Sequence, residues 1–260
     1  MQPPPIDFTV IPTGLTTREV RTAQFAEGQL QFCDCAAGSR WRAFFKLPQP
    51  ENQADILQRQ AAEAQERRQQ QLWENAGVPA KYKKFTLKSF RDVAGNDPEK
   101  QEAFDAVLEY HKEGGLLIEG IIKTGILLHG DPGVGKTGIL SPLFVDLLRQ
   151  GFSGLWVQYN ELMASLRDFE SGNVQERIEM CQTVDYLFID DFGDPASTRG
   201  ATDYARDTMF RIIDHRNNNT LPMFVTSNLD MAQIGDQFHV RLARRLGDAC
   251  AVIKMGGRAL

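Results

Sequence analysis

The most constraining feature of the sequence is a glycine-rich segment, GDPGVGKT, at Gly130–Thr137. It lies between an apolar run at 124–130, typical of a buried strand, and a run at 136–151 with apolar residues at helical spacing. In this context the pattern G-x-x-x-x-G-K-[ST] indicates a phosphate-binding loop, because glycines let the main chain wrap around an anion and the helix start adds its positive dipole end. The alternative is a tight strand–helix turn that carries Lys-Thr by chance.

The residue types of this segment predict a nucleoside triphosphate and its metal as ligands. Main-chain N–H groups would surround phosphate oxygens, Lys136 would reach the β- and γ-phosphates, and Thr137 would ligate Mg²⁺. The predicted cofactors are therefore ATP and Mg²⁺. The predicted nucleotide-binding loop consists of Gly130, Asp131, Pro132, Gly133, Val134, Gly135, Lys136, Thr137 and Gly138.

A second apolar run, Tyr186-Leu-Phe-Ile, ends in two carboxylates, Asp190 and Asp191. Ligands of open α/β sheets bind at the carboxyl ends of the strands, so both carboxylates are candidate site residues. Asp190 would hold Mg²⁺, and Asp191 would orient and deprotonate the attacking water. The alternative, a strand that ends in an acidic turn, is weakened because one strand–helix unit separates this run from the glycine-rich loop.

Two further polar features follow along the chain. Asn228 ends the next apolar strand, where its amide could contact the γ-phosphate or the attacking water; alternatively, Asn228 caps the following helix. Arg241, Arg244 and Arg245 share one face of a short predicted helix. One of them could reach the γ-phosphate of a neighbouring subunit as an arginine finger, or all three could form a solvated basic face.

Five apolar runs alternate with helical runs after residue 76, which predicts an α/β fold with a five-stranded parallel sheet between helices. The predicted strands are at 124–130, 154–159, 185–190, 221–228 and 249–255. The predicted helices lie at 97–114, 136–151, around 161–170 and near 204–216, and the last one follows the strand at 221–228 and ends in RLARRLG at residue 247.

Composition limits the class of protein and its compartment. A net charge of -5 argues against coating nucleic acid by bulk attraction, so any contact with DNA needs a local patch or an assembled ring. The start of the chain lacks the pattern of a secretory signal, and no apolar run is long enough to span a membrane. With only four cysteines and no disulfide framework, an intracellular, cytoplasmic protein is expected.

The first 75 residues have few large apolar residues for a core of their own. They contain a Pro-rich start, the sequence FCDC, and a polar run at 53–74 that predicts a helix. Two domains are therefore predicted: a partner-binding segment at 1–75 and a nucleotide-binding domain at 76–260. Cys33 and Cys35 are interpreted as small buried residues or a degenerate finger, since zinc would need four ligands.

Taken in order, the glycine-rich loop, IDDFG, TSN and RLARRL resemble the DnaC/IstB group of AAA+ ATPases, which are bacterial helicase loaders and transposition helper proteins. The resemblance covers about residues 73–258 and includes the segment WENAGVPAKYKKFTLKSF, which resembles the stretch leading into the ATPase core. It implies an AAA+ P-loop NTPase that hydrolyses ATP and forms a nucleotide-dependent oligomer whose subunits share active sites. It also implies binding to DNA, single-stranded or duplex; we expect single-stranded.

The resemblance also carries over residue by residue. Asp190 and Asp191 correspond to the Walker B pair, and Asn228 to sensor 1. Arg245 aligns best with the family's arginine finger, and Arg258 resembles a sensor-2 contact with the nucleotide. Because the sequence ends shortly after Arg258, a minimal or absent helical lid is expected. The expected partner is a replicative helicase, with a transposase as the alternative.

Two clusters of basic residues each allow more than one interpretation. The segment at 81–91 could be a strap over the adenine pocket, a DNA contact, or an exposed face with its aromatic residues tucked under. Four arginines after the Walker B pair could line a pore or an intersubunit face, or they are ordinary helix-surface charges: Arg199, Arg206, Arg211 and Arg216.

Overall fold

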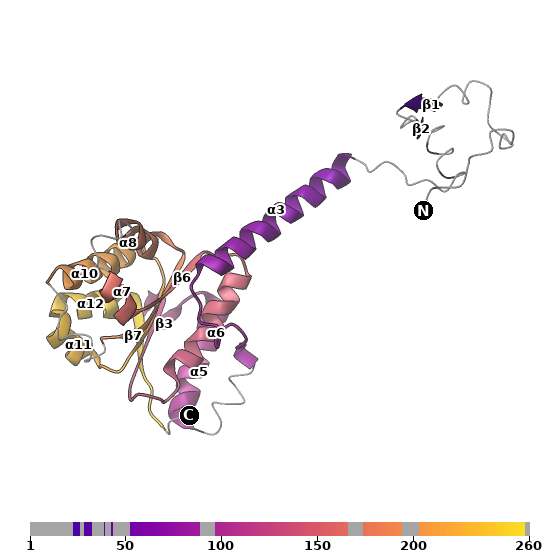
Figure 1. The fold of residues 1–260 in the computed structure, drawn as a ribbon. Helices are drawn as coiled ribbons and strands as arrows, with labels where there is room; N and C mark the ends of the chain where they lie inside the picture. The colour runs from indigo at the N-terminus through magenta and orange to yellow at the C-terminus, as the bar shows by residue number, and fades with distance from the viewer. Residues whose placement is uncertain are drawn as a thin grey trace. The chain divides into compact units, whose positions relative to one another are not determined.

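The computed structural model describes residues 23–26, 29–32, 39, 43, 53–88, 97–165, 174–193 and 203–257. By contacts, the chain divides into two compact units, Met1–Gln65 and Glu66–Leu260. The first unit contains an antiparallel hairpin of β1 (Ala23–Ala26) and β2 (Gln29–Phe32). Helix α3 (Gln53–Asn75) begins in the first unit and ends in the second, which holds the strands of the large sheet and the helices that cover it (Figure 1).

The second unit is built on a five-stranded parallel sheet, as predicted. Its strand order is β6-β7-β8-β5-β9, and every neighbouring pair is parallel. The strands are β5 (Gly125–His129), β6 (Gly154–Gln158), β7 (Tyr186–Phe192), β8 (Met223–Ser227) and β9 (Cys250–Lys254). The predicted strands therefore all exist and pair in one sheet.

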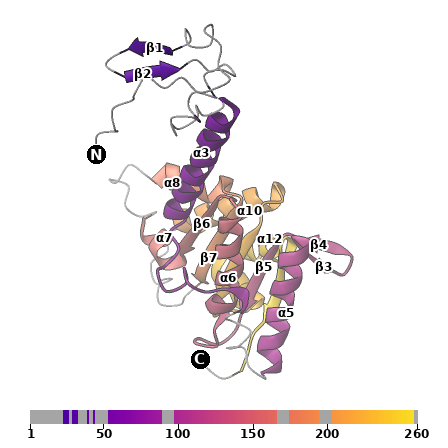
Figure 2. The same ribbon diagram turned by 90° about the vertical axis from the view of Figure 1, so that its right-hand side faces the viewer.

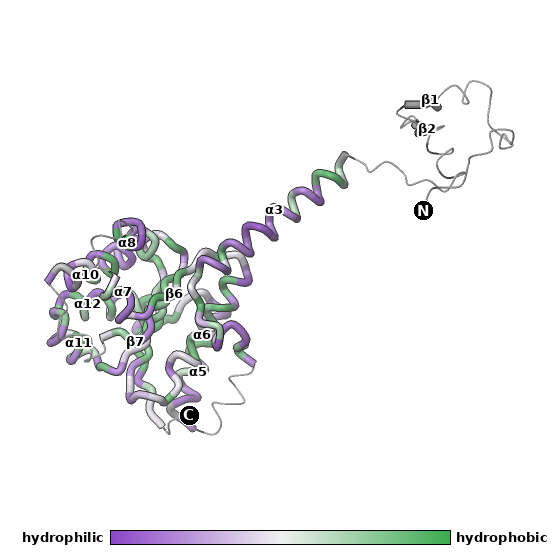
Figure 3. Tube along the Cα trace, in the orientation of Figure 1, coloured by the Kyte–Doolittle hydropathy of each residue, from purple (hydrophilic) through white to green (hydrophobic). Residues whose placement is uncertain are grey.

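Helices cover both faces of this sheet, which explains why the strands are apolar on both sides (Figures 1 and 3). Side chains alternate between the faces: Ile126 and Leu128 belong to one core and Leu127 to the other. One face carries α5 (Pro98–Glu113) and α6 (Lys136–Arg149). The other face carries α7 (Tyr159–Ser165), α8 (Val174–Thr183), α10 (Asp203–Asn218), α11 (Met231–Phe238) and α12 (Val240–Ala249).

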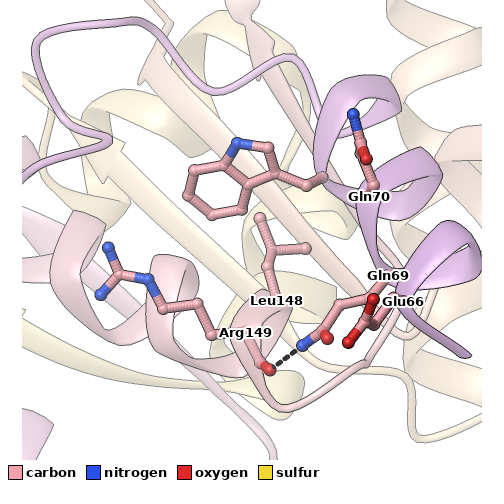
Figure 4. Close-up of a pocket in the computed structure, with 6 residues that line it drawn as sticks. Glu66, Gln69, Gln70, Leu148 and Arg149 are labelled. Atoms are coloured by element: carbon pink, nitrogen blue, oxygen red, sulfur yellow. Dashed lines mark hydrogen bonds between the residues drawn. The ribbon is translucent and has the colours of Figure 1, made fainter. Parts of the chain in front are cut away.

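The last turns of α3 pack against the rest of the second unit. Gln69 donates a hydrogen bond from Nε2 to the main-chain oxygen of Arg149, and Trp73 packs against the core (Figure 4). A groove of about 300 Å³ lies between the end of α3 and the end of α6. It is lined by Glu66, Gln69, Gln70, Trp73, Leu148 and Arg149. The boundary between the two units therefore lies within α3, ten residues before the boundary predicted from composition. The role of residues 1–75 in partner binding stays a prediction.

A small hairpin precedes the first strand of the sheet and was not predicted. β3 (Leu116–Ile118) pairs antiparallel with β4 (Ile121–Lys123) through a two-residue turn at Glu119 and Gly120, both with positive φ (Figure 2). Positive φ at both positions suits the right-handed twist of a hairpin. In the sequence, these residues look like part of one long apolar run, but four of the apolar side chains of the hairpin are exposed: Leu117, Ile118, Ile121 and Ile122.

The helix predicted to end in RLARRLG is split in two. Asp230 caps α11 through a capping box with Gln233, and the chain breaks at His239, where φ is 109°. Because Asp230 is the N-cap, the alternative role of Asn228 as a helix cap is wrong. In the described part of the chain, none of the helices has the length and apolar character needed to cross a membrane.

Arg216 corrects one sequence interpretation, because it is completely buried and lines no surface. Its guanidinium donates hydrogen bonds to five main-chain oxygens, those of Cys181, Gln182, Val184, Asp185 and Pro222. Burial lowers the pKa of Arg216 to about 10. The side chain thus connects the end of α8 to the starts of β7 and β8. Arg211 is exposed, Arg206 is partly exposed, and Arg199 lies outside the described residues.

Replacing Arg216 with methionine is expected to lower the free energy of unfolding by roughly 3–5 kcal/mol, because several buried carbonyls lose their donor at once. Chemical denaturation followed by circular dichroism measures the loss. Arg211→Met on the same helix is the matched control and should stay within about 0.5 kcal/mol of the wild type. Equal stabilities for the two variants would contradict the structural role given to Arg216.

Candidate nucleotide-binding site

The glycine-rich loop joins the end of β5 to the start of α6. Gly130, Gly133 and Gly135 have φ values of 146°, 81° and 101°, which are strained for any residue with a Cβ. A Cβ at Gly130 would also lie 1.9 Å from the main-chain oxygen of Met255, so close packing requires glycine there. Gly135 is the N-cap of α6 and supplies no side-chain acceptor, so the first N–H groups of the helix remain available to an anion.

Lys136 is the first residue of α6, and its ammonium group is surrounded by oxygens. It donates hydrogen bonds of 2.8 Å to the main-chain oxygens of Gly130 and Asp131 and to Oδ1 of Asn228. Burial lowers the pKa of Lys136, whereas the nearby carboxylates of Asp191 and Asp131 favour its charged form. Two predicted site residues far apart in sequence, Lys136 and Asn228, are thus in direct contact.

Thr137 and Asp190 also meet, at 2.8 Å between the Thr137 hydroxyl, which donates, and Oδ1 of Asp190. Asp190 is only 3% exposed at the end of β7. Its pKa is raised by burial, which the hydroxyls of Thr226 and Thr137 partly offset by donating hydrogen bonds to the carboxylate. A hydroxyl and a carboxylate side by side are oxygen ligands of the kind that Mg²⁺ binds, so the residues present fit that ion.

The side chain of Asp191 lies in a different environment from that of Asp190. Its φ of 53° lies in the left-handed region, and its side chain is exposed whereas that of Asp190 is buried. The pairing of β7 with β8 shifts register between Ile189 and Phe192, which places a bulge at the two carboxylates. The local backbone therefore directs adjacent carboxylates to different surroundings, one suited to a buried cation and one accessible to water.

Sequence reasoning missed the role of Thr226, although it lies in the TSN motif that drew attention to Asn228. The Thr226 hydroxyl donates to Oδ1 of Asp190 at 2.8 Å and accepts from the main-chain N–H of Asp191 at 3.0 Å. A polar residue in an otherwise apolar buried strand was the available signal, since buried polar groups need partners.

Among the described residues, the three arginines of α12 form no hydrogen bond or ion pair with the glycine-rich loop of their own chain. Nε of Arg245 lies 2.7 Å from Oδ1 of Asp214 on α10, so this guanidinium is held by a carboxylate of the same chain. Arg244 makes a long, exposed pair with Asp248 at 4.0 Å. Arg241 lies beside Asp203 and Asp207 in a surface pocket.

The basic segment before α5 lies against the edge of the sheet. Tyr82 stacks on Trp156 of β6 with ring centroids 5.2 Å apart, while Lys81 and Lys84 are exposed. The pKa of Lys81 is raised by its hydrogen bond with Tyr82, and more weakly by the charges of Asp190 and Asp191. Tyr82 is therefore tucked under this face, as predicted, whereas Phe85 is exposed and Phe90 lies outside the described residues.

Three sequence-based assignments fall where the structure gives no description. Arg258, Cys33 and Cys35 all lie outside the described residues. The remaining cysteines, Cys181 and Cys250, are free thiols buried in the core. Within the described ranges, no group of three or more His, Cys, Asp or Glu side chains could hold a metal ion.

The chain matches one protein-family model and several curated relatives. The model of the family described as IstB-like ATP binding protein matches residues 50–257. The replicative helicase loader DnaI of Bacillus subtilis (strain 168) is 26% identical over 152 residues, which is 58% of this chain and 47% of DnaI. The phage-like element PBSX protein XkdC of the same organism is 24% identical over 195 residues, or 73% of this chain and 72% of XkdC. The chain spans about half the length of DnaI and of the uncharacterised protein YqaM.

Solved structures show the same architecture. A crystal structure of DnaI has a TM-score of 0.56 and 26% identity, covering 70% of this chain and 94% of the other. The crystal structure of the DnaC helicase loader has a TM-score of 0.57 at 18% identity and covers 68% of this chain and 100% of the other. AMPPCP-bound DnaA from Aquifex aeolicus has a TM-score of 0.53 at 18% identity and covers 69% of this chain and 51% of the other. At these identities, the two structures show the fold alone. The chain therefore belongs to the IstB-like ATP binding protein family and has the fold of the AAA+ P-loop ATPases.

Proposed function

We propose that this protein hydrolyses ATP to ADP and phosphate and uses that cycle to load a replicative helicase onto DNA. The observation that supports the ATPase most is the convergence of Lys136, Asn228, Thr137 and Asp190 at the carboxyl edge of the sheet. Sequence similarity to the helicase loader DnaI supports the helicase as partner.

The chain's own residues define the proposed chemistry. The Lys136 ammonium would exchange its three protein oxygens for oxygens of the β- and γ-phosphates, releasing Asn228 toward the γ-phosphate or the water. Thr137 and Asp190 would hold Mg²⁺, which when bound neutralises charge on the phosphates. Asp191, accessible on its bulge, would orient the attacking water and accept its proton.

The proposal includes assembly of several subunits and binding to single-stranded DNA, both of which come from the resemblance of the ordered motifs. Arg245 would complete the active site of a neighbouring subunit, which requires release from Asp214. Both side chains are partly exposed, at 39% and 28%, but Oδ1 of Asp214 is buried, so assembly would have to offset the loss of this pair. The DNA would be held by the assembled ring rather than by bulk charge.

A second candidate function can be tested beside the first. It is an ATPase that assembles on DNA and regulates a transposase, which comes from the resemblance of the ordered motifs; the family match supports the ATP-binding part of it. The two functions share the nucleotide site and differ in the partner.

The purified full-length chain, mixed with Mg²⁺ and ATP, is expected to bind the purified replicative helicase of its own source and to stimulate unwinding of a DNA fork coated with single-stranded DNA-binding protein. Size-exclusion chromatography detects the complex, and a strand-displacement assay detects loading. Binding to a transposase of that source instead of the helicase would establish the alternative function.

A variant lacking residues 1–65 serves as the control, because this cut leaves Gln69 and Trp73 in contact with the core. It should bind ATP like the full chain but fail to bind the helicase. If the deletion unfolds the ATPase domain, the division into two parts is wrong; if helicase binding persists, the partner-binding role of the N-terminal segment is wrong.

A further inference from the structure

The bulge in β7 creates a specific requirement at β8. Two residues of β7, Asp190 and Asp191, stand opposite the single residue Thr226, between the regular pairs Ile189–Val225 and Phe192–Ser227. A bulged residue loses its place in the ladder, and a main-chain N–H without an acceptor is costly in the interior. The Thr226 hydroxyl oxygen accepts the N–H of Asp191 at 3.0 Å and so supplies the missing acceptor.

The direction of both hydrogen bonds of Thr226 follows from this contact. A hydroxyl has one hydrogen, and the N–H of Asp191 can only donate, so the hydroxyl uses a lone pair there. Its hydrogen is then directed to Oδ1 of Asp190, 2.8 Å away. Thr226 is completely buried, which leaves no room for solvent to take over either bond.

Oδ1 of Asp190 also accepts a hydrogen bond from the Thr137 hydroxyl. It therefore has two hydroxyl donors, one on α6 and one on β8. Removing the β8 donor would leave the carboxylate free to turn about its side-chain bonds, and the N–H of Asp191 without an acceptor. We propose that Thr226 is a positioning residue that orients both carboxylates of the site at once: Asp190 through its side chain and Asp191 through its main chain. This inference rests on the proposed binding of Mg²⁺ and ATP.

Ser227 provides a matched comparison, because it is the next residue, is equally buried, and also links β8 to β7. Its hydroxyl donates to the main-chain oxygen of Phe192 at 2.7 Å and accepts from the N–H of Leu229 at 3.0 Å. Ser227 therefore holds the main chain of the same two strands but touches neither carboxylate. A general loosening of the strands and a specific loss of carboxylate orientation can thus be separated.

The test measures affinity for a fluorescent non-hydrolysable ATP analogue as a function of Mg²⁺ concentration, together with the melting temperature. In Thr226→Val, which keeps the shape and removes the hydroxyl, the Mg²⁺ concentration for half-maximal effect should rise about 10–100-fold, as for other partners of metal ligands. Affinity without Mg²⁺ should be unchanged. Thr226→Ser should restore the wild-type requirement, and Ser227→Ala should keep it even if its melting temperature falls. If the valine variant does not fold, Thr226→Ala takes its place.

An unchanged Mg²⁺ requirement in a folded Thr226→Val or Thr226→Ala protein would overturn the inference and leave the proposed ATPase intact. An equal shift in Ser227→Ala would also overturn it, because general strand loosening would then explain the effect. If the wild type binds the analogue neither with nor without Mg²⁺, the inference and the proposed function both fail.

Discussion

Replacing Arg245 with alanine is expected to lower ATP turnover about 10³–10⁵-fold while ATP affinity stays close to that of the wild type, because an arginine finger acts on charge that develops in the transition state. The site of a single chain contains Lys136 and the carboxylates, but Arg244 and Arg245 of α12 contact other groups. Steady-state turnover and equilibrium binding of ATP, measured on the same samples, separate the two effects.

Asp214 offers a decisive control for this prediction. If Arg245 acts only by stabilising its own subunit through the 2.7 Å pair with Asp214, then Asp214→Asn should reproduce the loss of turnover. If Arg245 acts on a neighbouring subunit, Asp214→Asn should keep turnover at the wild-type level or above, because the guanidinium is released. Arg241→Ala and Arg244→Ala are the neighbouring controls, and a defect in either without one in Arg245→Ala would mean that the finger is misassigned.

Mixing variants tests whether the site is shared. Asp191→Asn should bind ATP but hydrolyse it slowly, since the base is lost and Asp190 is spared. Combined with Arg245→Ala subunits, it should regain part of the turnover, because one kind of interface joins an intact Asp191 to an intact Arg245. No recovery in the mixture, or a wild-type specific activity independent of protein concentration, would argue against a shared site.

The sheet and the convergence of Lys136, Thr137, Asp190 and Asn228 were predictable from sequence because their signals are local. The glycine-rich loop needs positive φ at Gly133 and Gly135, and only particular residues tolerate that. The strands read as continuous apolar runs because both of their faces are buried. The contact between Thr137 and Asp190 then follows from topology, since parallel strands bring their carboxyl ends to one edge.

Features that depend on contacts distant in sequence were not predictable. The burial of Arg216 relies on five carbonyls from two other segments, so its charge alone suggested a surface residue. The role of Thr226 depends on a bulge in a different strand.

The β3–β4 hairpin is local, but the sequence did not predict it. Glu119-Gly120 is a weaker turn signal than Asn-Gly, and Leu117 and Ile122 are 65% and 69% exposed although they are apolar.

The most direct test of the proposed ATPase is equilibrium binding of ATP with Mg²⁺ to the wild type and to Lys136→Ala, measured by isothermal titration calorimetry. Truncating a buried charged donor that contacts the ligand costs about 2–5 kcal/mol, so affinity should fall about 30-fold or more. Lys112→Ala, exposed on α5, should bind like the wild type, and melting curves should show that both variants are folded. Equal affinities of Lys136→Ala and wild type, with both folded, would contradict the assignment of the nucleotide site.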